Sequence, residues 1–142
     1  MNAGGEPLRV FIDGASRGNP GQAGFGVHVA RADGSAVAGL YGYLGTASNN
    51  VAEYEALLHA LRWALRKGVA RLQVFSDSEL VVKQMNGQYK VKHPDMIPRH
   101  REAQALLRRF ERASVAHVRR EQNQDADRLA NQAVDERASK LE

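Results

Sequence analysis

Four carboxylates lie where the burial rules for charged groups would not place them. Asp13 and Asp77 each end a strand-like apolar run, and Glu53 and Asp127 open the two most amphipathic helical segments. A buried carboxylate without a partner is so costly that a protein normally neutralises it or removes it. Several of them converging on one place indicate a site for divalent metal ions. We therefore expect the function of the chain to reside in these four acids.

The helical period separates these acids from their near neighbours. Glu53 and Asp127 align with the apolar residues of their helices, whereas Glu55 and Asp125 align with charged residues. We therefore expect Glu55 and Asp125 to be solvated and structural. Glu53 and Asp127 also lie in the first turn of a helix, where the helix dipole favours a negative charge.

The electrostatics of such a cluster require cations. Two unit charges about 5 Å apart repel by about 3 kcal/mol at an effective dielectric near 20. Each acid alone fits a turn or a helix dipole, but four in one crevice would not persist without metal ions. Because the chain has no cysteine and the ligands are all oxygen atoms, the pattern favours magnesium or manganese over zinc.

The charge balance suggests what such ions would act on. Lysine and arginine number 20 against 16 acids, and the stretch 83–120 is especially rich in cations. A basic surface around an acidic, metal-filled crevice favours a polyanionic substrate. Two divalent ions about 4 Å apart clamp the attacking and leaving oxygens of an in-line phosphoryl displacement. Metal-dependent hydrolysis of phosphodiesters is the predicted chemistry.

Hydrophobic periodicity predicts the elements that must position the acids. The expected strands are 8–13, 23–30, 36–44, 71–76 and 113–119, the expected helices are 50–67, 78–85, 99–112 and 123–137, and 14–21 is expected to be a turn-rich loop. Hairpins make the first three strands antiparallel, and helical crossovers make the last two parallel. The predicted fold class is α/β, with one five-stranded mixed sheet flanked by helices. If the first and fourth strands are parallel neighbours, Asp13 and Asp77 face one crevice at their carboxyl ends.

Length and composition favour a single soluble domain. The 142 residues are enough for a hydrophobic core that needs no disulfide or structural metal. We therefore expect one domain over 1–142 with flexible ends at 1–7 and 138–142. The absence of cysteine excludes disulfides and thiolate sites. We find no apolar run long enough to span a bilayer and no secretory signal. The expectation is a cytoplasmic monomer with no membrane partner.

Four segments carry a resemblance to a known family. They are 11–21, 48–57, 77–81 and 123–130, each contains one of the four acids, and together they cover nearly the whole chain in the family's order. On these segments the chain resembles type 1 ribonuclease H, with its ribonuclease H-like fold. Its short loops resemble the archaeal-like subgroup without a basic protrusion.

The resemblance implies an activity and a separate role for each of the four acids. It implies hydrolysis of the RNA strand of an RNA–DNA hybrid to 5′-phosphate and 3′-hydroxyl products, with two Mg²⁺ ions or Mn²⁺ as a substitute. By similarity, Asp13 bridges the two ions and Asp127 completes the ion that activates the attacking water. Glu53 and Asp77 hold the ion on the leaving 3′-oxygen.

The same resemblance implies contacts with the hybrid. Residues expected in the minor groove are Asn19, Asn49, Asn50 and the backbone from Gly14 to Ser16, with Glu79 near a ribose 2′-hydroxyl and Ser48 on the DNA strand. The 2′-hydroxyl is the group by which such a site distinguishes RNA from DNA. The Asn49–Asn50 pair also fits a helix cap, and both roles can coexist.

Two segments depart from the pattern of many family members. The link from Met85 to Pro98 is too short for the basic protrusion, which leaves residues 88–90 and Lys92 as possible substitutes. A histidine-bearing glycine loop before the last acid is also missing. In the archaeal-like subgroup an arginine at the position of Arg120 assists catalysis, whereas His117 is expected to end a strand.

Two other functions remain open from the residues. The fold is compatible with a DNA-directed nuclease or strand-transfer domain, although the Asn49–Asn50 contacts argue against it. A non-catalytic module that binds hybrids would be favoured if one acid were missing, but all four are present. Fold analogy alone does not decide between these functions.

Overall fold

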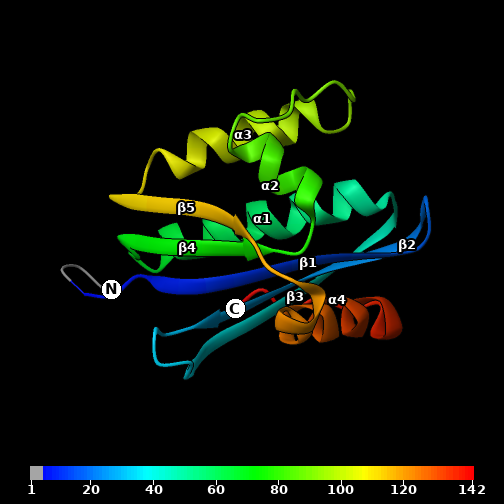
Figure 1. Ribbon diagram of the computed structural model, residues 1–142. Helices are drawn as coiled ribbons and strands as arrows, with labels where there is room; N and C mark the ends of the chain where they lie inside the picture. Colours follow the sequence, from blue (N-terminus) through cyan, green and yellow to red (C-terminus); the bar gives the residue numbers. More distant parts are fainter. Residues whose placement is uncertain (1–4) are drawn as a thin grey trace.

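The computed structural model describes residues 5–142, which form one mixed sheet with helices on both faces (Figure 1). The strands are β1 (Leu8–Gly18), β2 (Gly21–Ala30), β3 (Ala36–Ala47), β4 (Arg71–Ser76) and β5 (Arg112–His117). Their order across the sheet is β3-β2-β1-β4-β5, with β1–β2 and β2–β3 antiparallel and β1–β4 and β4–β5 parallel. The predicted fold class and strand directions are confirmed.

The helices are distributed over the two faces of this sheet. They are α1 (Asn49–Arg66), α2 (Glu79–Met85), α3 (Ile97–Leu107) and α4 (Gln124–Glu136), and a 3₁₀ turn, η1 (Arg120–Gln122), precedes α4. Gly14 of β1 faces α1, whereas Gly26, the cross-strand partner of Asp13, faces α4. Cross-strand partners share a face and successive residues alternate. The two helices therefore cover opposite faces, and α3 packs beside α1.

The main core lies between the sheet and α1. Val10 and Ile12 of β1 are fully buried, and so are Leu57 and Leu61 of α1. The spacing of the apolar residues in α1 matches a helix that buries one face along its whole length. Because this helix is fixed to the sheet over its length, its N-terminal part has a defined position above the middle of β1.

The helix α4 lies unusually close to β2. A Cβ atom on Gly26 would be 2.2 Å from the carbonyl oxygen of Ala126 and 2.6 Å from the backbone nitrogen of Ala130. Only glycine allows the helix backbone to approach the strand so closely. This contact fixes the height of α4, and with it the height of Asp127, above the sheet.

Several expected boundaries were wrong, among them the end of the third strand, which continues to Ala47 instead of stopping at 44. Residues 14–21 are not a loop, since β1 continues to Gly18 and pairs with β2 as far as Gly21, so that the turn consists of Asn19 and Pro20 alone. The third helix ends at Leu107 rather than at 112, because the chain must leave the helix to bury Phe110. The last strand covers 112–117 instead of 113–119, since its ladder with β4 already starts at Arg112.

The C-terminal residues, expected to be a flexible end, make defined contacts with β3. The backbones of Tyr41 and Lys140 exchange two hydrogen bonds of 2.9 and 2.8 Å, and the Ser139 hydroxyl accepts one from the backbone of Tyr43 at 3.0 Å. The expectation of a flexible N-terminal end falls in part on residues 1–4, which lie outside the described residues. No helix within 5–142 is long and apolar enough to cross a membrane.

The close packing of α4 generates a prediction about stability. Gly26→Ala should lower the free energy of unfolding by about 2–3 kcal/mol, since the new methyl group must displace the helix backbone. In the matched control Gly39→Ala, the new Cβ would lie 3.5 Å from the Leu129 side chain, an ordinary contact, so we expect a change below about 1 kcal/mol. Urea denaturation measures both, and equal losses would contradict the role given to Gly26.

Candidate active site

Three of the four predicted acids meet where the parallel ladder between β1 and β4 ends. Asp13 lies within β1, Asp77 follows the last residue of β4, and Glu53 lies in α1. Each offers a carboxylate oxygen within 4.8 Å of the others. Asp13 and Glu53 are both 5% exposed, and Asp77 is half-buried. The predicted convergence of these three side chains is confirmed.

The sheet register explains how Asp13 and Asp77 become neighbours. Ile12 pairs with Ser76 in the parallel ladder between β1 and β4, so the next residue on each strand carries its carboxylate to the same edge. The carboxyl ends of parallel strands are where ligands bind in open α/β sheets. Ser76 is completely buried, whereas Asp77, the next residue, is only half-buried.

Glu53 reaches the same place because Gly14 has no side chain. A Cβ atom on Gly14 would lie 2.4 Å from the backbone nitrogen of Glu53 and 2.8 Å from the Ala52 side chain. The backbone N–H of Gly14 donates to Glu53 Oε1 at 3.0 Å and to Asp13 Oδ1 at 3.0 Å. One peptide group thus holds two carboxylates in fixed positions.

Without a cation, the close approach of the three carboxylates is electrostatically unfavourable. Burial is the main reason why the pKa of Asp13 is raised, and the charges of Glu53 and Asp77 raise it further. Burial likewise raises the pKa of Glu53, opposed in part by the hydrogen bond from Gly14. Without a cation, Asp13 and Glu53 therefore hold protons that free carboxyl groups would lose.

The donor set fits divalent metal ions. Glu53 Oε2 is buried and has no hydrogen-bond partner among residues 5–142, which is unusual for a buried polar atom. Oxygen ligands alone suit Mg²⁺ and Mn²⁺. A cation would supply the missing partner and offset the repulsion between the carboxylates.

Asp127 is near this cluster but differs from it in burial. Its side chain contributes, as the smallest of the causes, to the raised pKa of Asp13, so it lies beside the cluster. The expectation that Asp127 shares the apolar face of its helix was wrong, because it is exposed. The first turn of α4 is anchored instead by Asn123, which is 1% exposed and donates through Nδ2 to the carbonyl of Ile12 at 2.9 Å.

The predicted substrate contacts fall into two groups. Asn19, Ser48 and Asn49 lie together, since the backbone of Asn49 donates to Asn19 Oδ1 at 3.1 Å. Ser16, on β1, donates its hydroxyl to the carbonyl of Ala47 at 2.9 Å. Glu79 lies apart from them, exposed at the start of α2 and ion-paired with Lys83.

The cap of α1 is Ser48, not the Asn49–Asn50 pair. The Ser48 hydroxyl accepts a hydrogen bond from the backbone of Val51 at 3.1 Å, the usual N-cap contact. The alternative that the two asparagines serve as the cap was therefore wrong. Both side chains remain available for other contacts, and that of Asn49 is exposed.

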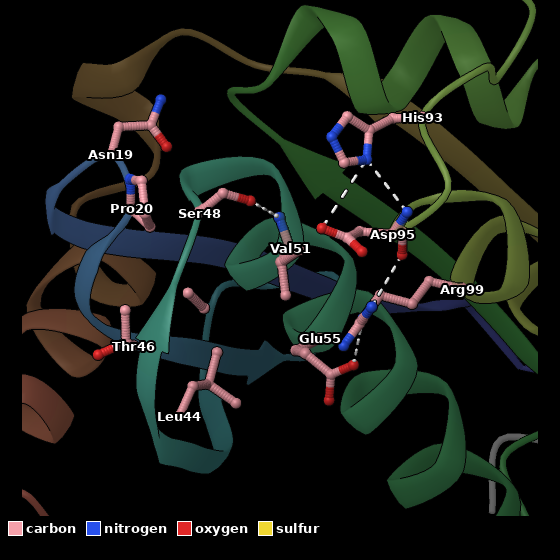
Figure 2. Close-up of a pocket in the computed structure, with 11 residues that line it drawn as sticks. Asn19, Pro20, Leu44, Thr46, Ser48, Val51, Glu55, His93, Asp95 and Arg99 are labelled. Atoms are coloured by element: carbon pink, nitrogen blue, oxygen red, sulfur yellow. Dashed lines mark hydrogen bonds and ion pairs between the residues drawn. The ribbon is translucent and has the colours of Figure 1, made fainter.

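Asn19 and Ser48 form one wall of a pocket of about 570 Å³ (Figure 2). The opposite wall carries His93, Asp95 and Arg99 from the short link after α2 and from α3. Arg99 Nε donates to Glu55 Oε2 at 2.9 Å. Glu55, expected to be solvated, is half-buried in this ion pair because α3 packs against α1. Sequence reasoning did not single out Arg99, whose partner comes from another helix.

Arg120 is the first residue of η1. It is exposed and lines an open hollow together with Asp127 and Arg128. His117 ends β5, as predicted, and its side chain is exposed. In the short link, Tyr89 is 47% exposed, and Lys83 Nζ lies 5.0 Å from the centre of its ring.

Comparison with known proteins gives the family. The family model described as "Reverse transcriptase-like" matches residues 11–133. Ribonuclease HI of Halobacterium salinarum is 41% identical over 93% of this chain and 66% of its own length. The crystal structure of the RNase H1 from that organism has a TM-score of 0.88, covering 92% of this chain and 98% of the other.

Two further relatives are informative. A bifunctional protein of Mycobacterium tuberculosis is 49% identical over 90% of this chain, and the chain spans 36% of its length. The crystal structure of LC11-RNase H1 in complex with an RNA/DNA hybrid has a TM-score of 0.87 at 36% identity, covering 92% of this chain and 98% of the other. Over nearly its full length, the fold and sequence show that this chain belongs to the type 1 ribonuclease H family.

Proposed function

We propose that this chain is an endoribonuclease that hydrolyses the RNA strand of RNA–DNA hybrids to 5′-phosphate and 3′-hydroxyl products. The observation that carries the proposal is the buried group of Asp13, Glu53 and Asp77 beside Asp127 at the carboxyl edge of the sheet. A purely structural role would not retain a cluster in which burial and the charges of Glu53 and Asp77 raise the pKa of Asp13. The residues 1–142 would act as one domain, monomeric and cytoplasmic.

The four acids would hold two Mg²⁺ ions, with Mn²⁺ as a substitute. Asp13, central to the cluster, would contact both ions, Asp127 one of them, and Glu53 and Asp77 the other. When bound, such ions activate a water molecule and stabilise charge on the leaving oxygen. The contribution of the protein is to keep the carboxylates in place, which Gly14 does through its two hydrogen bonds.

The polar residues beside the cluster would orient the hybrid. Asn19, Asn49, Asn50 and the backbone from Gly14 to Ser16 would face the minor groove, with Ser48 at the DNA strand and Glu79 near a ribose 2′-hydroxyl. The side-chain freedom of Asn49, which does not cap α1, supports this role. Recognition of the 2′-hydroxyl favours an RNA-directed over a DNA-directed nuclease.

The first prediction tests the activity with its substrate. Purified protein should cleave an RNA–DNA duplex in the presence of Mg²⁺ or Mn²⁺ and leave a DNA–DNA duplex intact, as measured on denaturing gels. Asp13→Asn should abolish cleavage and retain binding of the hybrid, because the amide keeps the shape of the side chain but loses its charge. Full activity of this variant would refute the assignment of the metal site, and cleavage of DNA–DNA would favour a DNA-directed nuclease.

The second prediction concerns stability without metal. Because the pKa of Asp13 in the folded protein is raised above its ordinary value of 3.8, ionisation opposes folding, and the loss of stability grows as the pH rises above about 4. In EDTA, Asp13→Asn should therefore be more stable than the parent at pH 7, by more than about 1 kcal/mol, and the difference should shrink toward pH 4. Added Mn²⁺ should stabilise only the parent. Urea titrations at several pH values measure this, and a difference independent of pH would contradict it.

The third prediction concerns Arg120. Arg120→Ala should slow turnover more than it weakens binding, because the guanidinium lies at the hollow shared with Asp127. The matched control is Arg128→Ala, which removes an exposed arginine of the same hollow that is paired with Asp125 at 3.2 Å. Steady-state kinetics separate kcat from KM. An unchanged kcat in the first variant would reduce Arg120 to a contact with the nucleic-acid backbone.

A further inference from the structure

Asp127 differs from the other three acids in what holds its side chain. Asp13 and Glu53 are buried and receive hydrogen bonds from the backbone of Gly14, whereas Asp127 is exposed at the start of α4. An exposed side chain keeps several rotamers unless a neighbour restrains it. A carboxylate side chain that is free to rotate loses this freedom when it binds a metal ion, and this loss lowers the affinity for the ion.

The neighbour that restrains Asp127 is Asn131. Asn131 lies one helical turn further along α4, and its Nδ2 donates to Asp127 Oδ1 at 3.3 Å and to the Asp127 carbonyl at 3.0 Å. The first contact leaves Oδ2 of Asp127 available for an ion. Residues four apart on a helix face each other, so the contact needs no distortion of the helix.

A second contact determines the orientation of the Asn131 amide. Arg17 Nη2 donates to Asn131 Oδ1 at 3.3 Å, and Arg17 Nη1 forms an ion pair with Asp135 at 2.6 Å. A guanidinium can only donate hydrogen bonds, so the amide oxygen must face Arg17 and the amide N–H groups must face Asp127. In the reversed orientation, the amide N–H groups of Asn131 would face the donors of Arg17, and its amide oxygen would face the carboxylate oxygen of Asp127. Neither contact is a hydrogen bond.

This chain of contacts connects the two elements that carry the acids. Arg17 lies four residues after Asp13 on β1, and Asn131 lies four residues after Asp127 on α4. The pair therefore joins the end of the strand to the helix on the side where the ions would bind. The ion pair between Arg17 and Asp135 reinforces the same connection between β1 and α4.

We propose that Asn131 is a positioning residue for Asp127 and that Arg17 fixes the orientation of Asn131, so that the pair sets the affinity of the ion bound by Asp127. The inference rests on the proposed function, since it concerns the same metal site. Residues that hydrogen-bond to a metal ligand typically change metal affinity or activity about 10- to 100-fold when they are removed. The effect should fall on one ion, because Asn131 makes no contact with Glu53 or Asp77.

The experiment compares Asn131→Leu with the matched control Gln132→Leu. Both changes replace an amide with leucine on adjacent residues of α4, but Gln132 donates to Glu136, away from the site. Binding of Mn²⁺ is measured by electron paramagnetic resonance on the free protein, in the absence of a nucleic acid that could be cleaved. In parallel, the rate of cleavage of an ordinary hybrid is measured as a function of Mg²⁺ concentration.

We expect Asn131→Leu to lower the affinity for one Mn²⁺ ion about 10-fold and to leave the affinity for the other ion unchanged. The Mg²⁺ concentration for half-maximal rate should rise about 10-fold, saturating Mg²⁺ should restore most of the rate, and KM for the hybrid should stay constant. Gln132→Leu should match the parent. Arg17→Ala should shift the Mg²⁺ dependence in the same direction, and this variant tests the inference even if Asn131→Leu fails to fold.

Other outcomes separate the inference from the proposed function. A Mn²⁺ affinity and Mg²⁺ dependence unchanged in both Asn131→Leu and Arg17→Ala would overturn the positioning role, and so would an equal loss at both ions. If the parent protein binds no Mn²⁺ and cleaves no hybrid, the proposed function itself fails. A rise in KM without a change in metal dependence would overturn the inference by assigning Arg17 to the nucleic acid.

Discussion

The mutual repulsion of carboxylates in a poorly hydrated crevice is the constraint on which this structure depends. The groups cannot move apart, because Asp13 is part of a continuous strand and Glu53 belongs to a helix whose apolar face is buried along its length. The hydrophobic core thus provides the free energy that keeps like charges together. This arrangement is typical of functional sites, where local strain is maintained by the stability of the surrounding fold.

The strand β1 links the parts of the site. Its first half contributes Val10 and Ile12 to the core, its middle carries Asp13, and its far end leads to Asn19 at the pocket in Figure 2. Because β1 is one continuous, hydrogen-bonded strand, the packing of its first half also fixes the position of its polar end. Gly14 and Gly26, two of the glycines that lack room for a Cβ, determine how closely α1 and α4 approach this ladder.

The sequence predicted the features that follow from hydrophobic period and strand direction. The sheet, its mixed pairing and the meeting of Asp13, Glu53 and Asp77 needed only the positions of apolar residues and the direction of each strand. Prediction failed where tertiary partners override local pattern. Residues 14–18 contain turn-forming types, yet they continue β1 because β2 pairs with them. Glu55 was assigned to the solvated face of α1, since the position of Arg99 on α3 cannot be derived from the helical period.

The exposure of Asp127 was missed for a related reason. Periodicity places a residue on a helix face, but it does not tell where the helix extends beyond the sheet it covers. The contacts of Asn123 with Ile12 and of Arg17 with Asn131 join segments more than 100 residues apart in the chain. No local signal in the sequence identifies such partners.

The pairing of Lys140 with Tyr41 has a consequence for the behaviour of the protein in concentrated solution. β3 is an outer strand of the sheet, and unpaired peptide groups on an outer strand can recruit a strand from another molecule. The C-terminal residues occupy part of that row with their own backbone. Without the residues around Lys140, this part of β3 would be open to pairing with a strand of another molecule. We therefore expect their pairing with β3 to hinder aggregation.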